Sequence, residues 1–134
     1  MPHLVILYTK NLDAETDMTG LCRALADTML SIRDESDKQV FPTGGVRVLA
    51  YPAAHSAVAD GQRDYAFAYL NLRMGRGRSA EVKKLTGERL LATARGHFEP
   101  VLAARYIGIT LQIDEGQEVF DAKHSTIHPL FAGR

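Results

Sequence analysis

The chain has 134 residues, enough for a single domain with a substantial core. Its 16 basic and 16 acidic side chains balance, so no net charge favours binding to nucleic acid or to an anionic membrane. No apolar run approaches the ~20 residues that span a bilayer, and the start lacks the basic segment of a secretory signal. The single cysteine, Cys22, fits a reducing compartment. We therefore expect one cytoplasmic domain over residues 1–134, with neither nucleic-acid nor membrane partners.

Four strands and two helices are expected. The strands are recognised by β-branched or alternating apolar residues, and the helices by a capping residue followed by apolar residues at helical spacing. In chain order the expected elements are a strand at 3–9, a helix at 17–33 capped by Asp17, a strand at 46–51, a strand at 65–74, a helix that Ser79 caps and that has Pro100 near its end, and a strand at 107–113.

The two halves of the chain repeat one pattern. The helix caps Asp17 and Ser79 are 62 residues apart, and the strands before and after each cap follow the same offset. The halves, about 2–54 and 64–114, are each a strand, a helix and a strand, followed by a tail at 115–134. Right-handed crossovers make each strand pair parallel. This pattern predicts an α+β fold, a four-stranded sheet with both helices on one face.

The sheet face opposite the helices is expected to be apolar. The strand at 65–74 offers either its row of Tyr65, Phe67 and Tyr69 or its row of alanine and leucine. Both rows are too apolar to face water over such an area, so we expect a closed homo-oligomer. The tail is apolar around 119–120 and 127–131 and is expected to dock on the domain.

Pro2 precedes the first strand directly and has two interpretations. Proline suits the start of a strand, where its nitrogen need not donate to the ladder. Alternatively, removal of Met1 leaves a secondary amine, a base whose reference pKa of about 7.7 to 8.0 lies close to physiological pH. If Met1 is retained, the nitrogen is an amide and cannot act as a base.

Two other segments carry charges suited to anions. Residues 75–80 formally match G-x-G-x-x-A between a strand and a helix, but no acidic residue ends the next strand at the expected distance. The segment is either an anion site with Arg76 and Arg78 or a capped turn with solvated arginines. Arg47 lies within an apolar strand, where it either points to solvent or binds a carboxylate.

The histidines give no metal signature. His124 and His128 are four residues apart, but Pro129 argues against a helix there, and no cysteine or carboxylate completes a set. We expect no metal.

These features resemble the tautomerase superfamily, whose members use an N-terminal proline as catalytic base. The chain is more closely similar to the 5-carboxymethyl-2-hydroxymuconate isomerase family, and the similarity runs from Pro2 into the tail. The family pattern, however, has smaller or lysine side chains where Arg73 and Arg76 stand. The segments that carry the resemblance are Gly45-Val46-Arg47, Ala59-Asp60-Gly61-Gln62, Asp64-Tyr65-Ala66-Phe67, Gly77-Arg78-Ser79 and Ile127-His128-Pro129-Leu130-Phe131.

The resemblance implies a cofactor-free, homotrimeric isomerase of aromatic catabolism. Pro2 is the implied catalytic base, and Arg47 and Arg78 match the arginines that bind substrate carboxylates. The implied reaction converts an unsaturated 2-hydroxy di- or tricarboxylic acid to the conjugated 2-oxo acid, with 5-carboxymethyl-2-hydroxymuconate of homoprotocatechuate catabolism as substrate. Two alternatives remain open: another tautomerase activity, such as on arylpyruvates, and a non-catalytic module that binds small carboxylates.

Overall fold

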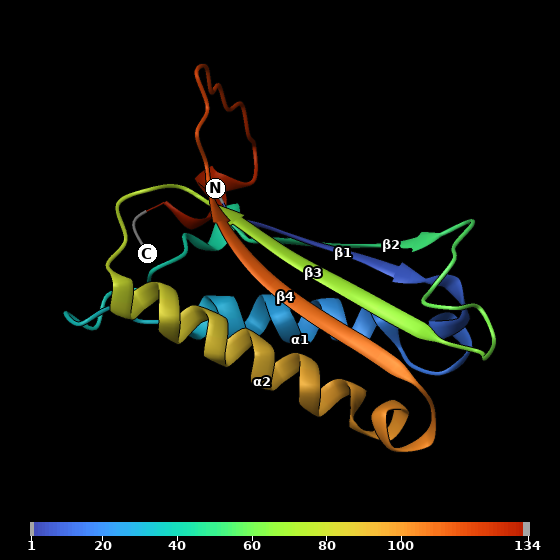
Figure 1. The fold of residues 1–134 in the computed structure, drawn as a ribbon. Helices are drawn as coiled ribbons and strands as arrows, with labels where there is room; N and C mark the ends of the chain where they lie inside the picture. The colour runs from blue at the N-terminus through green and yellow to red at the C-terminus, as the bar shows by residue number, and fades with distance from the viewer. Residues whose placement is uncertain (1, 133–134) are drawn as a thin grey trace.

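A four-stranded mixed sheet forms the centre of the computed structural model, which describes residues 2–132 (Figure 1). Its strand order is β2-β1-β3-β4. The central strands β1 (His3–Thr9) and β3 (Ala66–Met74) are antiparallel, whereas β2 (Arg47–Ala53) is parallel to β1 and β4 (Ile107–Glu115) is parallel to β3. The predicted strand–helix–strand repeat, with parallel strands in each half, is confirmed.

Both helices begin at the predicted caps. In α1 (Met18–Ser31), the Asp17 carboxylate accepts a hydrogen bond from the Gly20 amide at 2.9 Å. In α2 (Ala80–Ala104), the Ser79 hydroxyl accepts one from the Val82 amide at 3.2 Å. Three short 3-10 helices complete the structure: η1 (Lys10–Ala14), η2 (Thr43–Gly45) and η3 (His128–Phe131).

Several predicted boundaries were wrong by one or two residues, including the end of the fourth strand, which continues to Glu115. The first helix ends at Ser31 rather than near Arg33. The second strand starts at Arg47 and continues through Pro52 to Ala53, beyond the predicted end at Tyr51. Proline is tolerated there because β2 lies at the edge of the sheet, where one side needs no hydrogen-bond donor.

The core lies between the sheet and the two helices, which cover the same face (Figure 1). The alanine and leucine row of β3 is buried there, so the aromatic row with Phe67 and Tyr69 faces the other side. That second face is apolar and partly open to solvent: Leu7, Leu49 and Tyr51 are each about half exposed. The choice between the two rows, which the sequence left open, is thus decided in favour of the aromatic one.

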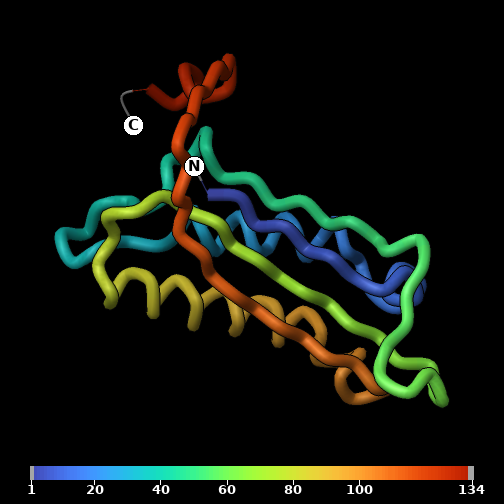
Figure 2. Tube along the Cα trace, turned by 45° about the horizontal axis from the view of Figure 1, so that its top comes forward, coloured from blue at the N-terminus to red at the C-terminus, as the bar shows by residue number. Residues whose placement is uncertain are grey.

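The C-terminal segment projects beyond the end of the sheet before it returns to the domain (Figures 1 and 2). It returns at η3, which packs against η2 so closely that a Cβ at Gly44 would lie 2.8 Å from the His128 Cα. The expected docking of the tail is therefore confirmed at η3. It is wrong for Val119 and Phe120, which are almost fully exposed.

Neither helix, nor any other in residues 2–132, is both long and apolar enough to cross a membrane.

Candidate functional site

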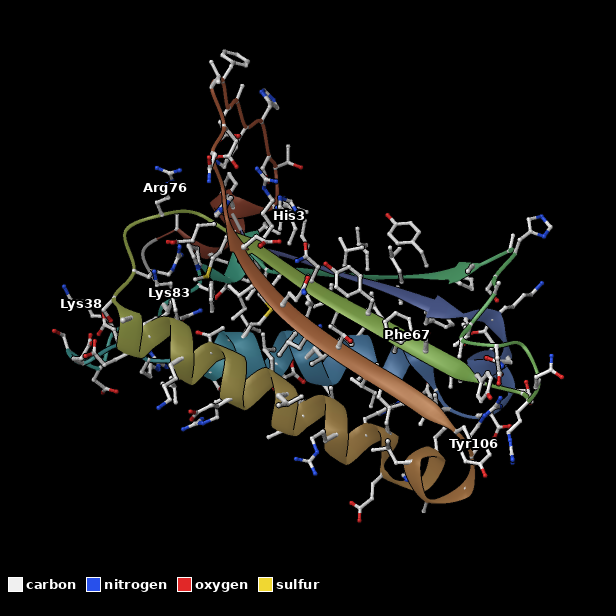
Figure 3. All side chains as sticks on the ribbon, in the orientation of Figure 1. His3, Lys38, Phe67, Arg76, Lys83 and Tyr106 are labelled. Carbon is white, nitrogen blue, oxygen red and sulfur yellow. The ribbon has the colours of Figure 1, made fainter. Side chains whose placement is uncertain are left out.

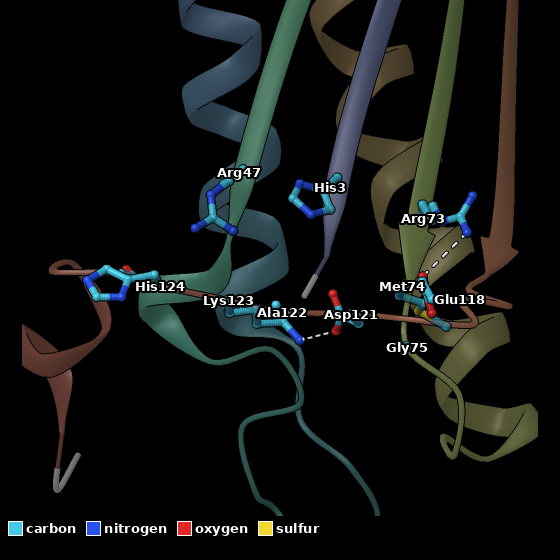
Figure 4. A pocket seen from close by; sticks show the side chains of 11 residues that line it. His3, Arg47, Arg73, Met74, Gly75, Glu118, Asp121, Ala122, Lys123 and His124 are labelled. Atoms are coloured by element: carbon cyan, nitrogen blue, oxygen red, sulfur yellow. Dashed lines mark hydrogen bonds and ion pairs between the residues drawn. The ribbon is translucent and has the colours of Figure 1, made fainter.

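A cavity of about 400 Å³ lies at the end of the sheet where β1 begins (Figure 4). Three cavity side chains form a row across neighbouring strands, because His3 of β1 pairs with Arg47 of β2 on one side and with Arg73 of β3 on the other. Adjacent strands are roughly 4.8 Å apart, so the Cα atoms of the two arginines are about 10 Å apart. The row thus places two arginines in one cavity, one on each side of His3.

The segment after β4 forms the opposite wall of this cavity. Figure 4 shows Glu118, Asp121, Lys123 and His124 along that wall, facing the strand ends. Glu118 makes an ion pair with Arg73 at 3.4 Å, and Asp121 pairs with Lys123. Cations outnumber carboxylates around the cavity, which therefore favours an anionic ligand.

His3 stands between the two arginines without adding to their charge. Burial lowers its pKa from the usual range, and the positive charges of Arg47 and Arg73 lower it further. The imidazole is consequently neutral at pH 7, and it can donate or accept a hydrogen bond in the middle of the row.

Pro2 is buried and lies one residue before this row. It is absent from the described lining of the cavity, which starts at His3. Arg47 does line the cavity, from the first position of β2, and one of its guanidinium nitrogens lies 3.5 Å from the Gly45 carbonyl oxygen. Two of the three predicted site residues are therefore at or next to this end of the sheet.

Arg78, the third predicted site residue, lies in a neighbouring cavity of about 700 Å³ that also contains Arg76 and Lys83. Figure 3 shows Arg76 and Lys83 at the same end of the molecule as His3, with Tyr106 at the far end. The structure does not bring Arg78 into the cavity with Arg47.

The Arg78 guanidinium instead holds the loop around it. It donates hydrogen bonds to the carbonyl oxygens of Gly75 at 3.1 Å and Val40 at 3.3 Å, and it stacks over Phe41 at 5.0 Å from the ring centre. Burial lowers its pKa, although an arginine still stays charged at neutral pH. Arg78 therefore contacts Gly75, a residue that lines the first cavity, without lining that cavity itself.

Residues 75–80 form a turn that ends at the cap of α2, but Arg76 and Arg78 are held by backbone carbonyl groups rather than simply solvated, so neither interpretation from the sequence is settled. Arg76 donates to the Gly116 carbonyl oxygen at 2.9 Å, and the Ser79 hydroxyl, besides capping α2, donates to Glu35 at 2.8 Å. Both arginines of the segment thus have backbone partners.

Sequence reasoning did not place His3, Arg73 or the segment after β4 in this cavity. Arg73 stood out only as a departure from the family pattern. The available signal was strand register, because charged residues at the starts and ends of strands paired in the sheet lie side by side. No such signal existed for the wall, whose position depends on the path of the chain after β4.

Residues 2–132 contain no group of three histidine, cysteine or carboxylate side chains placed to hold a metal ion. Cys22 lies half buried in α1, and burial raises the pKa of its thiol, as expected for a packing residue rather than a nucleophile.

Two strand–helix–strand units around a mixed sheet, with a cationic cavity where the first strand begins, define a protein of the tautomerase fold. A fused 4-OT symmetric trimer shares this architecture, with 18% identity, a TM-score of 0.55, and coverage of 90% of this chain and 93% of that one. The model of the 5-carboxymethyl-2-hydroxymuconate isomerase family matches residues 2–131, so the chain belongs to that family. The predicted fold and family are confirmed.

Three relatives support this assignment over nearly the whole chain. The 5-carboxymethyl-2-hydroxymuconate Delta-isomerase of Escherichia coli is 29% identical over 131 residues, which cover 98% of this chain and 99% of that protein. A crystal structure of a 5-carboxymethyl-2-hydroxymuconate delta-isomerase is 56% identical, with a TM-score of 0.94, and the match covers 98% of this chain and 93% of that one. The structure of a 5-carboxymethyl-2-hydroxymuconate isomerase from Deinococcus radiodurans R1 is 37% identical, with a TM-score of 0.86, and the match covers 97% of this chain and 93% of that one. The prediction that the chain is an isomerase is confirmed.

Proposed function

We propose that this isomerase converts 5-carboxymethyl-2-hydroxymuconate, a dienol triacid, to its conjugated 2-oxo form, without a cofactor, in the cytoplasmic breakdown of aromatic acids. The observation that carries the proposal is the row of Arg47, His3 and Arg73 at the start of β1. A substrate with several carboxylates needs at least two fixed cations near the catalytic base, and the row supplies them one residue from Pro2.

In the proposed mechanism Met1 is removed and the Pro2 nitrogen is the base. The amine takes the proton of the 2-hydroxyl group, the enol oxygen becomes a carbonyl, and the double bonds shift along the chain. The protonated amine then returns the proton to the distant carbon, where a new C–H bond forms. No oxidant or reductant is needed, because the proton lost from oxygen balances the proton gained by carbon.

The same cations would activate the base. Positive charge near an amine disfavours its protonated form and lowers its pKa, and partial burial acts in the same direction. Arg47 is therefore proposed to bind one substrate carboxylate and to keep Pro2 unprotonated near neutral pH. Arg78, assigned to carboxylate binding from the family motif, remains a proposal, and its contact with Gly75 connects it to this cavity.

The test is a comparison of two substrates with purified protein. We expect the value of kcat/KM for the dienol triacid to exceed that for the enol of phenylpyruvate by roughly a hundredfold, because the latter has one carboxylate and can bind only one of the two guanidinium groups. Following both ketonisations by ultraviolet absorbance measures the ratio. Equal or reversed values would favour the arylpyruvate activity instead.

We also propose a homotrimer. The apolar face of the sheet, with Leu7, Leu49, Tyr51 and the aromatic row of β3, is left open by a single chain, and closed assembly is the simplest way to cover it. Sedimentation equilibrium is expected to give one species near three times the monomer mass. A stable monomer at micromolar concentration would contradict this proposal.

A further inference from the structure

We propose that Arg73 binds a second carboxylate of the substrate, and that Glu118 of this chain occupies Arg73 as an internal carboxylate until the substrate displaces it. The inference rests on the proposed function in one respect, the polycarboxylate class of the substrate. The row geometry, the anchoring of Glu118 and the weakness of its ion pair support it separately.

The row geometry places Arg73 as a counterpart of Arg47. Both arginines pair with His3 in the strand register, one on each side, and both line the same cavity (Figure 4). A six-carbon diacid such as the muconate skeleton can therefore reach both guanidinium groups when the two side chains lean toward His3. The cavity of about 400 Å³ is large enough for such a ligand.

Glu118 is anchored beside Arg73 by the backbone before it. The Gly116 amide donates to the Met74 carbonyl oxygen at 2.8 Å, and the Gly116 carbonyl oxygen accepts from the Arg76 side chain at 2.9 Å. The Glu118 carboxylate then folds back over Gly116 so closely that a Cβ at position 116 would clash with its oxygens. The missing side chain at position 116 thus makes room for a carboxylate on the Arg73 side of the cavity.

The Arg73–Glu118 ion pair is weak enough for a substrate carboxylate to displace Glu118. The closest contact is 3.4 Å, and the two side chains remain 54% and 44% exposed. Such pairs change an equilibrium by at most about fivefold. The Glu118 pKa lies below its usual range, first because of a hydrogen bond from the residue's own backbone amide and then because of Arg73, so the carboxylate is charged throughout the neutral range.

A substrate carboxylate has an advantage that a separate small acid lacks. When its partner carboxylate is bound at Arg47, the second group is presented to Arg73 at high effective concentration. A monocarboxylate gains nothing from this tethering and has to compete with Glu118 alone. Glu118 therefore makes the site selective for acids that carry two suitably spaced carboxylates.

The test measures binding without turnover. Isothermal titration at low salt compares adipate, the saturated six-carbon diacid, with hexanoate, which has the same carbon chain and one carboxylate fewer. The variants are Glu118→Gln, Arg73→Gln and Arg73→Lys. Asp27→Asn serves as a matched control, because Asp27 forms an exposed ion pair with Arg23 on α1.

Adipate is expected to bind wild-type protein at least tenfold more tightly than hexanoate. Arg73→Gln should weaken adipate roughly tenfold and largely abolish this preference, whereas Arg73→Lys should recover part of it. Glu118→Gln should strengthen adipate binding by up to about fivefold, and Asp27→Asn should leave it unchanged.

Two results would overturn the proposal: adipate binding that Glu118→Gln leaves at the level of the Asp27→Asn control, or an Arg73→Gln variant that keeps the wild-type preference for adipate. The substrate comparison described above tests the proposed function separately. If the variants bind adipate and hexanoate as expected but the protein does not isomerise the dienol triacid, only the proposed function is overturned. If the protein isomerises the triacid but the variants do not bind as expected, only the roles of Arg73 and Glu118 are overturned.

Discussion

Protein that retains Met1 is expected to lose isomerisation of the dienol triacid entirely, while it still folds and assembles. The physical reason is that the Pro2 nitrogen is then an amide, whose lone pair is delocalised and cannot accept a proton. Mass spectrometry of the purified N-terminus defines which form is assayed, and steady-state absorbance measures the rate. Normal turnover by the form with Met1 attached would show that Pro2 is not the base and merely precedes β1.

Two further measurements separate the chemistry of the amine from its position. Pro2→Ala keeps an amine that is primary and less rigid, so activity should fall without vanishing. In the processed wild-type protein the rate should decline on the acid side as the amine becomes protonated. The midpoint of that decline should lie below the reference pKa of about 7.7 to 8.0, because Arg47 and partial burial disfavour the protonated form. A non-catalytic carboxylate-binding module would show neither effect.

Local signals in the sequence predicted most of the fold. The caps Asp17 and Ser79 and the alternation along β3 depend on neighbouring residues, and all three were predicted correctly. The end of β2 was missed because Pro52 normally ends a strand, and only its place at the sheet edge permits it. Val119 and Phe120 were expected to dock because they are apolar, but composition cannot distinguish a contact within the chain from one with another copy.

The candidate site was predictable only in part, because it depends on contacts between distant segments. Pro2 and Arg47 were selected from sequence, and strand register brings Arg47 beside the residue that follows Pro2. Arg73 reaches the same row through the antiparallel pairing of β1 and β3, a pairing that the repeat pattern did not specify. Glu118 lies opposite because Gly116 continues the hydrogen bonding of β4 to β3.

The structure gives Arg47 and Arg78 different surroundings, although the family resemblance implied carboxylate binding for both. Arg47 lines the cavity beside His3, whereas the Arg78 side chain is used to hold two carbonyl groups and to stack on Phe41. Replacement of each arginine should therefore produce a different combination of lost activity and lost stability.

Arg47→Ala is expected to lower kcat/KM for the dienol triacid roughly tenfold to a hundredfold while thermal stability hardly changes. A charge-assisted contact to a carboxylate is worth about 1.5 to 3 kcal/mol, which corresponds to that range. Arg78→Ala should also lower activity, but it should in addition lower the melting temperature by several degrees. The reason is that two hydrogen bonds of about 0.5 to 1.5 kcal/mol each and a cation–π contact are lost from a half-buried side chain.

Arg95→Ala, on the exposed surface of α2, serves as the control for removal of an arginine as such and should leave both quantities unchanged. Melting curves for all variants should be taken at one protein concentration, because assembly makes the transition depend on concentration. Full activity in Arg47→Ala would show that the cavity beside His3 does not bind the reacting acid. Wild-type stability in Arg78→Ala would show instead that its contacts with Gly75, Val40 and Phe41 contribute nothing to the folded state, leaving carboxylate binding as the reason for an arginine at that position.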